Sequence, residues 1–347
     1  MINDIRSMLL PELQTAFKEK GLPAYRAGQV YQWLHKQKVT DYNMMTNLPA
    51  SLRQSLASEY PLHGCEIMRK QVSAHDGTVK YLFELYDGEL IETVIMKYKY
   101  GYTVCVSTQA GCKMGCAFCA STVGGFRRHL LPGEILSEIY TAENDLNITV
   151  SHIVLMGMGE PLDNYDNVMR FLTLITNPDG HNLSMRNISL STCGIVPRIR
   201  DLMQKHLQLT LSISLHAPFD DMRSKIMPVN RTYHIDSLLQ ACRQYAAETS
   251  RRISFEYAML SGINDTDECA HALGKQLKGM LCHVNLIPVN EVAESPFHPS
   301  TSERVEAFIK VLAGYGITAT VRRKLGSDID ASCGQLRLRH KDNEQSE

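Results

Sequence analysis

The sequence predicts an α/β fold: a partial (β/α)6 TIM-like barrel with a small helical N-terminal domain and a short β extension. From residue 103 onward, strand-like and helix-like segments alternate, which is typical of a parallel sheet with crossover helices. Residues 1–60 show only helical periodicity, whereas residues 61–100 contain short strands around a hairpin turn. A chain of 347 residues suits one large domain with smaller additions.

Residues 1–60 are expected to form a helical accessory domain. Apolar residues recur at helical spacing in 11–19, 26–38 and 48–58, and polar or Gly- and Pro-containing linkers separate these segments. Residues 25–36 mix aromatic and basic side chains, which suits either contact with RNA or an ordinary solvated helix face.

Residues 61–100 are expected to form the β extension. Segments 81–86 and 90–96 have the composition of strands, and Asp87-Gly88-Glu89 between them is a hairpin signal. The pattern changes to alternating strands and helices from Thr103.

Residues 101–325 are expected to form the barrel, and residues 326–347 a C-terminal tail. Strands are predicted at 103–108, 151–156, 187–191, 209–215, 252–258, 282–287 and 317–321. Helices are predicted at 132–145, 165–175, 197–205, 234–247, 266–277 and 302–314. About six strand–helix units with a trailing strand indicate an open barrel, and ligands then bind at the carboxyl ends of the strands.

Composition limits the classes of protein that this chain can belong to. It has no run of 18 apolar residues and no signal-peptide pattern at its start, so we expect no membrane span and a cytoplasmic location. Ten cysteines in such a chain favour metal binding or thiol chemistry over disulfides. The net charge of −1 gives no overall sign of nucleic-acid binding, which would have to come from local patches.

Three closely spaced cysteines are the most informative motif. Cys112, Cys116 and Cys119 follow a C-x3-C-x2-C pattern just beyond the first barrel strand, and Phe118 precedes the third. Three thiolates can hold three irons of a 4Fe-4S cluster and leave the fourth iron open. The pattern resembles that of radical S-adenosylmethionine (SAM) enzymes, in which the methionine part of SAM chelates the open iron and reduction releases a 5′-deoxyadenosyl radical. The alternatives are redox thiols or a zinc knuckle, for which no fourth ligand follows at the usual spacing.

Polar motifs follow several predicted strands. Gly157-Met-Gly-Glu-Pro161 suits a loop whose backbone meets the amino group of a bound methionine, or else a tight turn; it lacks the third glycine of a dinucleotide fingerprint. Segments 189–194, 212–217 and 285–290 place hydroxyls, an imidazole and amides at further strand ends. Four such segments on one rim predict a cofactor site.

Two further cysteines lie at opposite ends of the barrel region. Cys105 is on the first predicted strand, and Cys333 lies in a polar, glycine-flanked stretch after the last one. If they converge at the mouth, they suit a covalent intermediate that is resolved by disulfide formation. The alternative is that free cysteines are small buried apolar residues. That interpretation is the one applied to the remaining cysteines, namely Cys65, Cys193, Cys242, Cys269 and Cys282.

Taken together, these motifs resemble the RlmN/Cfr family of radical SAM RNA methyltransferases over nearly the whole chain. The resemblance rests on the segments 105–112, 125–128, 157–161, 214–216 and 328–335, together with the cysteine trio.

The resemblance implies a role for each matching residue. Cys112, Cys116 and Cys119 would hold the 4Fe-4S cluster. SAM would be contacted by Gly159, Glu160, Ser191, Ser214, Leu215, His216 and Asn290. Cys333 would take a methyl group from one SAM, and the radical from a second SAM would remove a hydrogen atom from it. The resulting methylene radical would add to C2 of adenine, Cys105 would release the product by forming a disulfide with Cys333, and Glu92 would be the proton acceptor. Without the resemblance, Glu92 is equally well explained as an exposed strand carboxylate.

The resemblance also implies substrates and partners. The product would be 2-methyladenosine in the peptidyl-transferase centre of 23S rRNA and 3′ of the anticodon in tRNA, and the base would have to be unstacked. A low-potential donor such as flavodoxin or ferredoxin would supply electrons to a monomeric enzyme. Candidate phosphate contacts, or otherwise solvated loop charges, are Arg127, Arg128, His129, Arg322, Arg323 and Lys324.

Three other functions remain open from the sequence. One is Cfr-like methylation of C8 of the same rRNA adenosine, because the catalytic parts are shared. The second is a non-catalytic, zinc-binding protein associated with RNA. The third is radical SAM chemistry on another substrate.

Overall fold

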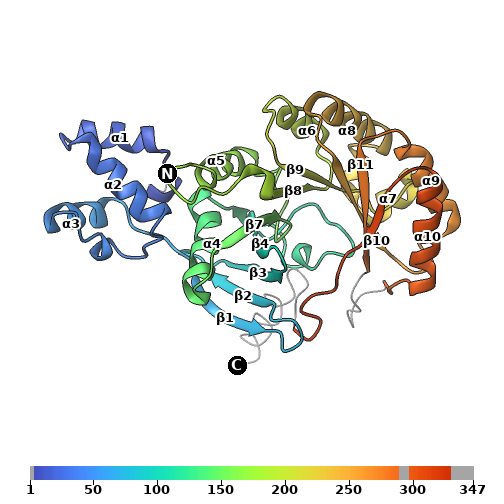
Figure 1. Cartoon of the computed structure of the whole chain (residues 1–347), viewed down its shortest axis with the longest axis horizontal. Coiled ribbons are helices and arrows are strands. Elements are labelled where there is room, and N and C mark those ends of the chain that lie inside the picture. The colour runs from blue at the N-terminus through green and yellow to red at the C-terminus, as the bar shows by residue number, and fades with distance from the viewer. Residues whose placement is uncertain (1–3, 289–296, 330–347) are drawn as a thin grey trace.

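The computed structural model describes residues 4–288 and 297–329 (Figure 1). One ten-stranded sheet runs through the described chain in the order β1-β2-β3-β4-β7-β8-β9-β10-β11-β12. The first four strands are antiparallel and the rest, from β4 onward, are parallel. The predicted α/β fold with an open barrel is therefore confirmed.

The N-terminal helices form a separate lobe at one end of the molecule (Figure 1). They are α1 (Leu10–Glu19), α2 (Ala24–His35) and α3 (Ala50–Glu59), and a 3-10 turn at Tyr42–Met44 lies between α2 and α3. Buried Phe17 and Val30 belong to the main apolar core. Arg6 ties this lobe to the barrel, because its guanidinium donates to Val39 O at 2.8 Å and to Ser137 Oγ of the first barrel helix at 3.1 Å.

The β extension is an antiparallel meander of β1 (Glu66–Val72), β2 (Val79–Glu84) and β3 (Leu90–Tyr98). The predicted hairpin is confirmed: Gly88 has a φ of 78°, and the N–H of Leu85 donates to the carbonyl of Glu89 at 2.9 Å. Because β3 pairs with β4, the extension and the barrel share one continuous sheet.

The barrel strands and helices lie close to the predicted segments. The strands are β4 (Gly101–Cys105), β7 (Val150–Leu155), β8 (Ile188–Thr192), β9 (Thr210–Ser214), β10 (Ile253–Met259), β11 (Cys282–Pro288) and β12 (Ala319–Val321). The predicted helices are α4 (Pro132–Leu146), α5 (Tyr165–Ile175), α6 (Val196–Met203), α8 (Ile235–Thr249), α9 (Asp267–Leu277) and α10 (Ser302–Gly314). Among the described barrel residues, the sequence did not predict α7 (Asp220–Ile226), the two-residue strands β5 (Gln109–Ala110) and β6 (Arg128–His129), or several short 3-10 turns.

The two faces of the parallel sheet differ in polarity. Strand residues such as Ile153, Leu190, Ile213 and Phe255 are fully buried on the helical side. Strand registers place a row of polar residues on the opposite, concave face, consisting of Ser191, Ser212, Ser214, Ser254, Glu256, Asn285 and Thr320. A closed barrel fills its interior with bulky branched side chains. The concave face here is instead suited to polar ligands.

The chain returns across the opening of the barrel after β12. We call residues 322–329 the crossing segment. It follows β12 directly and begins beside β11, where the N–H of Arg322 donates to Leu286 O at 2.8 Å. From there it reaches the turn between β1 and β2 (Figure 1). There the N–H of Gly326 donates to Asp76 Oδ2 at 2.8 Å. The segment therefore links the two edges of the sheet.

None of the helices in the described ranges combines the length and apolarity needed to cross a membrane.

Candidate active site

The cysteine trio lies on a loop that leaves β4 and passes in front of the strand ends. Gly111 and Gly115 have φ values of 80° and 71°, which let the loop turn sharply at two points. The N–H of Ala117 donates to Ile226 O of α7 at 2.9 Å and fixes the loop there. Phe118 packs edge-on against His216, with ring centroids 4.8 Å apart, so this loop contacts the end of β9.

The three thiols lie in a largely apolar environment. Burial, reinforced by the charge of Cys119 nearby, raises the pKa of Cys112 to about 12 and shifts the pKa of Cys116 upward as well. Free thiols at Cys112 and Cys116 would stay protonated at neutral pH, and a metal would have to displace their protons. No set of three ligand side chains in the described ranges is spaced to hold a single metal ion. A cluster binds each thiolate through a different iron, and the donor set of three cysteines with an apolar surround fits that role.

The loop after β7 packs tightly against the segment after β4. A Cβ at Gly157 would lie 2.6 Å from Val106 O, and one at Gly159 would lie 2.6 Å from Gln109 Cβ. Gly159 also has a φ of 100°, which side-chain-bearing residues rarely adopt. Both positions therefore require glycine, because the two loops approach each other too closely to admit a side chain. This packing accounts for the glycine-rich sequence that is partly similar to a dinucleotide fingerprint.

Glu160 is buried, and its carboxylate holds backbone groups of the protein. It accepts from the N–H of Cys193 at 2.7 Å and from the N–H of Leu162 at 3.0 Å. Its own N–H donates to Gln109 Oε1 at 2.8 Å. Burial raises the pKa of Glu160 although these hydrogen bonds oppose the shift. The structure thus gives Glu160 a clear role in joining the loops after β4, β7 and β8.

Ser191, Ser214, Leu215 and His216 come together at the ends of β8 and β9. The hydroxyl oxygens of Ser191 and Ser214 are 3.5 Å apart. His216 has a φ of 57°, a left-handed conformation that strains a residue with a large side chain. Its Nδ1 accepts from the N–H of Ala258 at 2.9 Å, and burial lowers its pKa to about 3. The imidazole is therefore neutral at physiological pH, with its tautomer set by that hydrogen bond.

Arg223 of α7 is a residue of this region that the sequence analysis missed. Its side chain is fully buried and donates to the carbonyls of Cys193, Leu215 and Ser214 at 2.7, 3.0 and 3.1 Å. It also donates to Asn230 Oδ1 at 2.9 Å. One guanidinium thus fixes the backbone at the ends of both β8 and β9. Arginines are usually exposed, and no local pattern distinguished this one.

Cys105 and Glu92 share one face of the sheet. Cys105 pairs with Val94 of β3, two residues from Glu92, so both side chains point to the concave side. Glu92 is 2% exposed, and its Oε2 lies 3.0 Å from Nζ of the fully buried Lys80. The interpretation of Glu92 as an exposed carboxylate is therefore wrong. Lys80 is a second residue that the sequence analysis missed.

The thiol of Cys105 is partly exposed but desolvated. Burial raises its pKa to about 11, and the positive charge of Arg322 acts in the opposite direction. Arg322 begins the crossing segment, so this segment passes near Cys105.

Glu138 of α4 supports these strands from the helical side. It is buried and accepts hydrogen bonds from the N–H of Ser107 at 2.9 Å and from the hydroxyl of Thr93. Burial shifts the pKa of Glu138 far above its ordinary value.

Two predicted site residues, Asn290 and Cys333, lie outside the described residues. Of the other cysteines, Cys65, Cys193, Cys242 and Cys269 are buried, as expected for small apolar side chains, whereas Cys282 is partly exposed.

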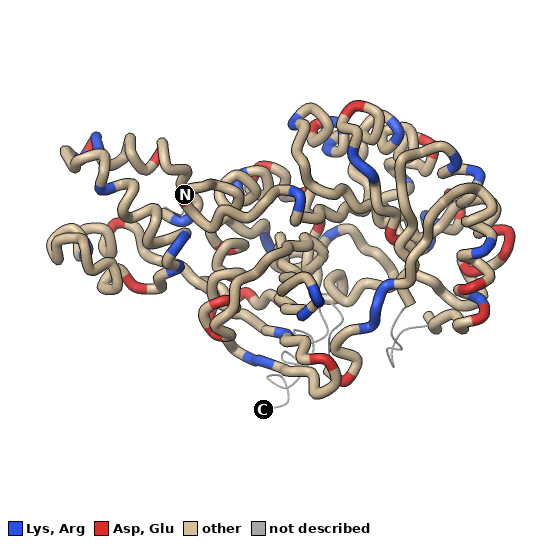
Figure 2. Tube along the Cα trace, viewed as in Figure 1, with Lys and Arg blue, Asp and Glu red and all other residues tan. Residues whose placement is uncertain are grey.

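The candidate phosphate contacts divide into two groups. Arg128 is engaged by Asp87 at 2.5 Å and Glu134 at 2.7 Å, which does not leave its guanidinium available for RNA. Arg127 is 53% exposed and lies 3.9 Å from Glu89. Arg323 and Lys324 are also exposed, and Figure 2 shows the basic run that they form with Arg322 on the crossing segment.

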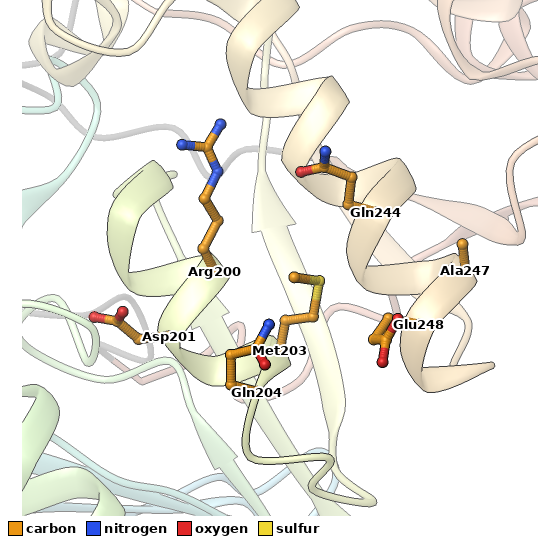
Figure 3. Close-up of a pocket in the computed structure, with 7 residues that line it drawn as sticks. All are labelled: Arg200, Asp201, Met203, Gln204, Gln244, Ala247 and Glu248. Carbon is orange, nitrogen blue, oxygen red and sulfur yellow. The ribbon is translucent and has the colours of Figure 1, made fainter.

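A surface hollow of about 540 Å³ lies elsewhere, between α6 and α8 on the outer helical layer (Figure 3). Its charged and amide lining comes from Arg200, Asp201, Gln204, Gln244 and Glu248. It is separated from the concave face by the sheet and is no part of the candidate active site.

Two family models match the chain. The model described as the radical SAM superfamily matches residues 106–273, and that of the ribosomal RNA large subunit methyltransferase N-terminal domain matches residues 3–61. A protein from Clostridium perfringens described as a probable dual-specificity RNA methyltransferase RlmN is 51% identical over 97% of each chain. One of the same description from Lachnoclostridium phytofermentans is 48% identical over 98% of this chain and 95% of its own.

A solved structure is similar over the same extent. The crystal structure of a radical SAM methyltransferase from Sphaerobacter thermophilus has a TM-score of 0.92 and 43% sequence identity, and the match covers 96% of this chain and 98% of that one. The likeness therefore includes the helical lobe and the β extension as well as the barrel.

Proposed function

Because this chain belongs to the RlmN family of radical SAM RNA methyltransferases, we propose that it methylates C2 of an adenosine in 23S rRNA and in tRNA. The rRNA target would be the peptidyl-transferase centre, and the tRNA target the adenosine 3′ of the anticodon. The observation that carries the proposal is the common face of Cys105 and the buried Glu92–Lys80 pair, beside the loop of the cysteine trio.

The chemistry of the target explains why this enzyme needs both a cluster and free thiols. C2 of adenine is an electron-poor aryl carbon, so it cannot attack the methyl group of SAM directly. Cys112, Cys116 and Cys119 would hold a 4Fe-4S cluster, which would supply the electron for cleavage of SAM to a 5′-deoxyadenosyl radical. Gly159, Glu160, Ser191, Ser214, Leu215, His216 and Asn290 would contact SAM.

Two cysteine thiols of the protein, Cys333 and Cys105, take part in transferring the methyl carbon from SAM to the base. Cys333 would accept a methyl group from one SAM, lose a hydrogen atom from that group to the radical of a second SAM, and form a C–C bond to C2. Two SAM molecules are consumed for each methyl group transferred. Glu92 accepts the proton that leaves C2, and Lys80 at 3.0 Å stabilises its carboxylate. The Cys105 thiolate would then attack Cys333 Sγ, so an S–S bond would form and the S–C bond to the base would break. The released methylene carbon would take a proton to become the methyl group, and the one electron in excess after radical addition would pass back to the 4Fe-4S cluster.

Nucleoside analysis tests the proposal. Both RNA pools from cells with and without the gene are digested and analysed by mass spectrometry, with 2-methyladenosine and 8-methyladenosine standards. Loss of 2-methyladenosine from both pools is expected. Loss of 8-methyladenosine instead would assign Cfr-like methylation of C8. If the amounts of both modified nucleosides were unchanged, neither activity could be assigned to this protein.

Cysteine variants test the intermediate. Cys333→Ala is expected to abolish methyl transfer while 5′-deoxyadenosine is still formed, and Cys105→Ala to leave RNA covalently attached to Cys333. Cys282→Ala, a partly exposed thiol on β11, is the control and should retain activity. Retained methylation in Cys333→Ala would contradict the mechanism.

The cluster itself is tested by anaerobic purification. We expect a brown protein that absorbs light at roughly 400 nm, which is typical of iron–sulfur proteins. A colourless zinc protein would support a binding role instead.

We further propose a cytoplasmic monomer that takes electrons from flavodoxin or ferredoxin. Gel filtration tests the oligomeric state, and reduction of the cluster by each donor tests the source of electrons.

A further inference from the structure

The crossing segment is fastened to the turn between β1 and β2 by two aspartates that act reciprocally. Asp328 accepts hydrogen bonds from Ser73 Oγ at 2.6 Å and from the N–H of Ala74 at 2.8 Å. Asp76 accepts one from the N–H of Gly326 at 2.8 Å. Each carboxylate thus binds the backbone of the other segment. We call these five residues the clamp.

The turn that carries the clamp is itself well ordered by hydrogen bonds. Ser73 is 3% exposed, and its N–H donates to Thr78 O at 2.8 Å. Asp76 Oδ1 accepts from the N–H of Thr78 at 2.9 Å. Although partial burial opposes the shift, hydrogen bonds from Thr78 and Gly326 lower the pKa of Asp76 to about 2. Its carboxylate is therefore charged at neutral pH, when charge-assisted hydrogen bonds are strongest.

The clamp lies next to the start of β2, the strand that carries Lys80. β2 begins at Val79, directly after the turn, and its second residue is Lys80, the partner of Glu92. Cys333 follows Asp328 by five residues, a length of chain that reaches at most about 18 Å. Arg322, at the other end of the crossing segment, is close enough to Cys105 to affect its pKa.

We propose that the clamp positions the tail so that Cys333 meets Cys105, and that Asp76 and Asp328 are positioning residues. This rests on the roles proposed above for the two cysteines. With the clamp intact, Asp328 is held five residues before Cys333. Without the clamp, the nearest preceding residue whose backbone is hydrogen-bonded to the sheet is Arg322, eleven residues before Cys333. The effective concentration of a tethered group falls with about the −3/2 power of tether length, so release of the clamp lowers it about threefold.

The test uses the full-length, cluster-loaded protein under anaerobic conditions. Asp76→Ala and Asp328→Ala each remove one side of the clamp. Asp41→Ala is the control, because Asp41 caps another turn by accepting from the N–H of Asn43 at 2.8 Å and lies in the N-terminal lobe. Two rates are measured: trypsin cleavage after residues 322–324, and formation of the Cys105–Cys333 disulfide in oxidised glutathione, followed by peptide mass spectrometry.

We expect both clamp variants to be cleaved faster by trypsin and to form the disulfide more slowly than the unaltered protein, by up to about threefold. Asp41→Ala should match the unaltered protein in both rates. Unchanged rates in the clamp variants, or equal slowing in the control, would overturn the positioning role. Failure of the unaltered protein to form this disulfide would instead refute the roles of the two cysteines, so the two failures are distinguishable.

Discussion

At the scale of single residues, the site depends on buried charges whose partners are mostly backbone groups. Arg223 donates to three carbonyls, and Glu160 accepts from two N–H groups at the same strand ends. A buried charge is costly unless its hydrogen bonds are complete. These two side chains therefore fix the backbone at the strand ends that we propose as the SAM site, including the strained His216.

Replacement of Arg223 tests this view. Arg223→Met should lower the free energy of unfolding by about 3 kcal/mol, because it leaves the carbonyls of Cys193, Ser214 and Leu215 without their donor. Urea unfolding measures the loss. Arg200→Met, an exposed arginine on α6, should change it by less than about 0.5 kcal/mol. A similarly small change for Arg223→Met would show that water replaces the guanidinium.

The reactivity of Cys105 should depend on pH and on Arg322. Because its folded pKa is raised to about 11, the thiolate fraction and the rate of alkylation by iodoacetamide should rise about tenfold per pH unit from 7 to 9. Arg322→Gln removes the charge that lowers this pKa, so alkylation should be slower at each pH. Peptide mass spectrometry follows the reaction, with Cys282 as an internal control. A rate independent of pH would contradict the raised pKa.

At the scale of elements, two loops meet too closely to admit side chains. Gly159→Ala would push the loop after β7 away from Gln109 and strain a backbone with a φ of 100°. A displacement of the order of 1 Å in a cofactor site costs about 100-fold in rate. We expect that loss in 5′-deoxyadenosine formation. Gly28→Ala, in helix α2 with no atom within 4 Å of the new Cβ, is the control. Normal cofactor cleavage by Gly159→Ala would show that the loop adapts.

The strands and helices were predictable because each is long enough to show its period. All seven barrel strands were predicted, since β-rich segments alternate with amphipathic helices. β4 ends at Cys105, earlier than predicted, because Thr108 and Gln109 turn away to bond the carbonyl of Met158. Helix α7 has seven residues, and β5 and β6 have two each, which is too short for a periodic signal.

The site was predictable where its chemistry is local in sequence and not where it depends on burial. The cysteine trio and the strand-end loops are continuous motifs. Lys80 and Arg223 act through partners that only the folded chain brings near, and charged residues are ordinarily exposed. The available signal for Lys80 was a lysine within an otherwise apolar strand, on the same sheet face as Glu92 of the next strand and diagonal to it.

At the scale of the whole molecule, binding of RNA must come from local patches, because the net charge is −1. The crossing segment concentrates basic residues beside the opening of the barrel (Figure 2). Arg127, on the loop after the trio, is exposed as well. Arg128 differs, because two carboxylates already neutralise it.

Salt dependence separates these roles. Arg127→Ala should weaken RNA binding and reduce the slope of log affinity against log salt by about 1, as the loss of one phosphate contact does. Arg128→Ala should leave the slope unchanged and lower the melting temperature. Filter binding at several salt concentrations measures the slope. A change in slope for Arg128→Ala alone would reverse the assignment.

The long separation in sequence between the two sides of the clamp has a consequence for folding. The bond between Ser73 and Asp328 joins residues 255 positions apart in a chain of 347. Closing so long a loop costs more conformational entropy than local pairing does, so such contacts form late. We therefore expect the strands of the sheet to assemble before the crossing segment closes over the barrel opening.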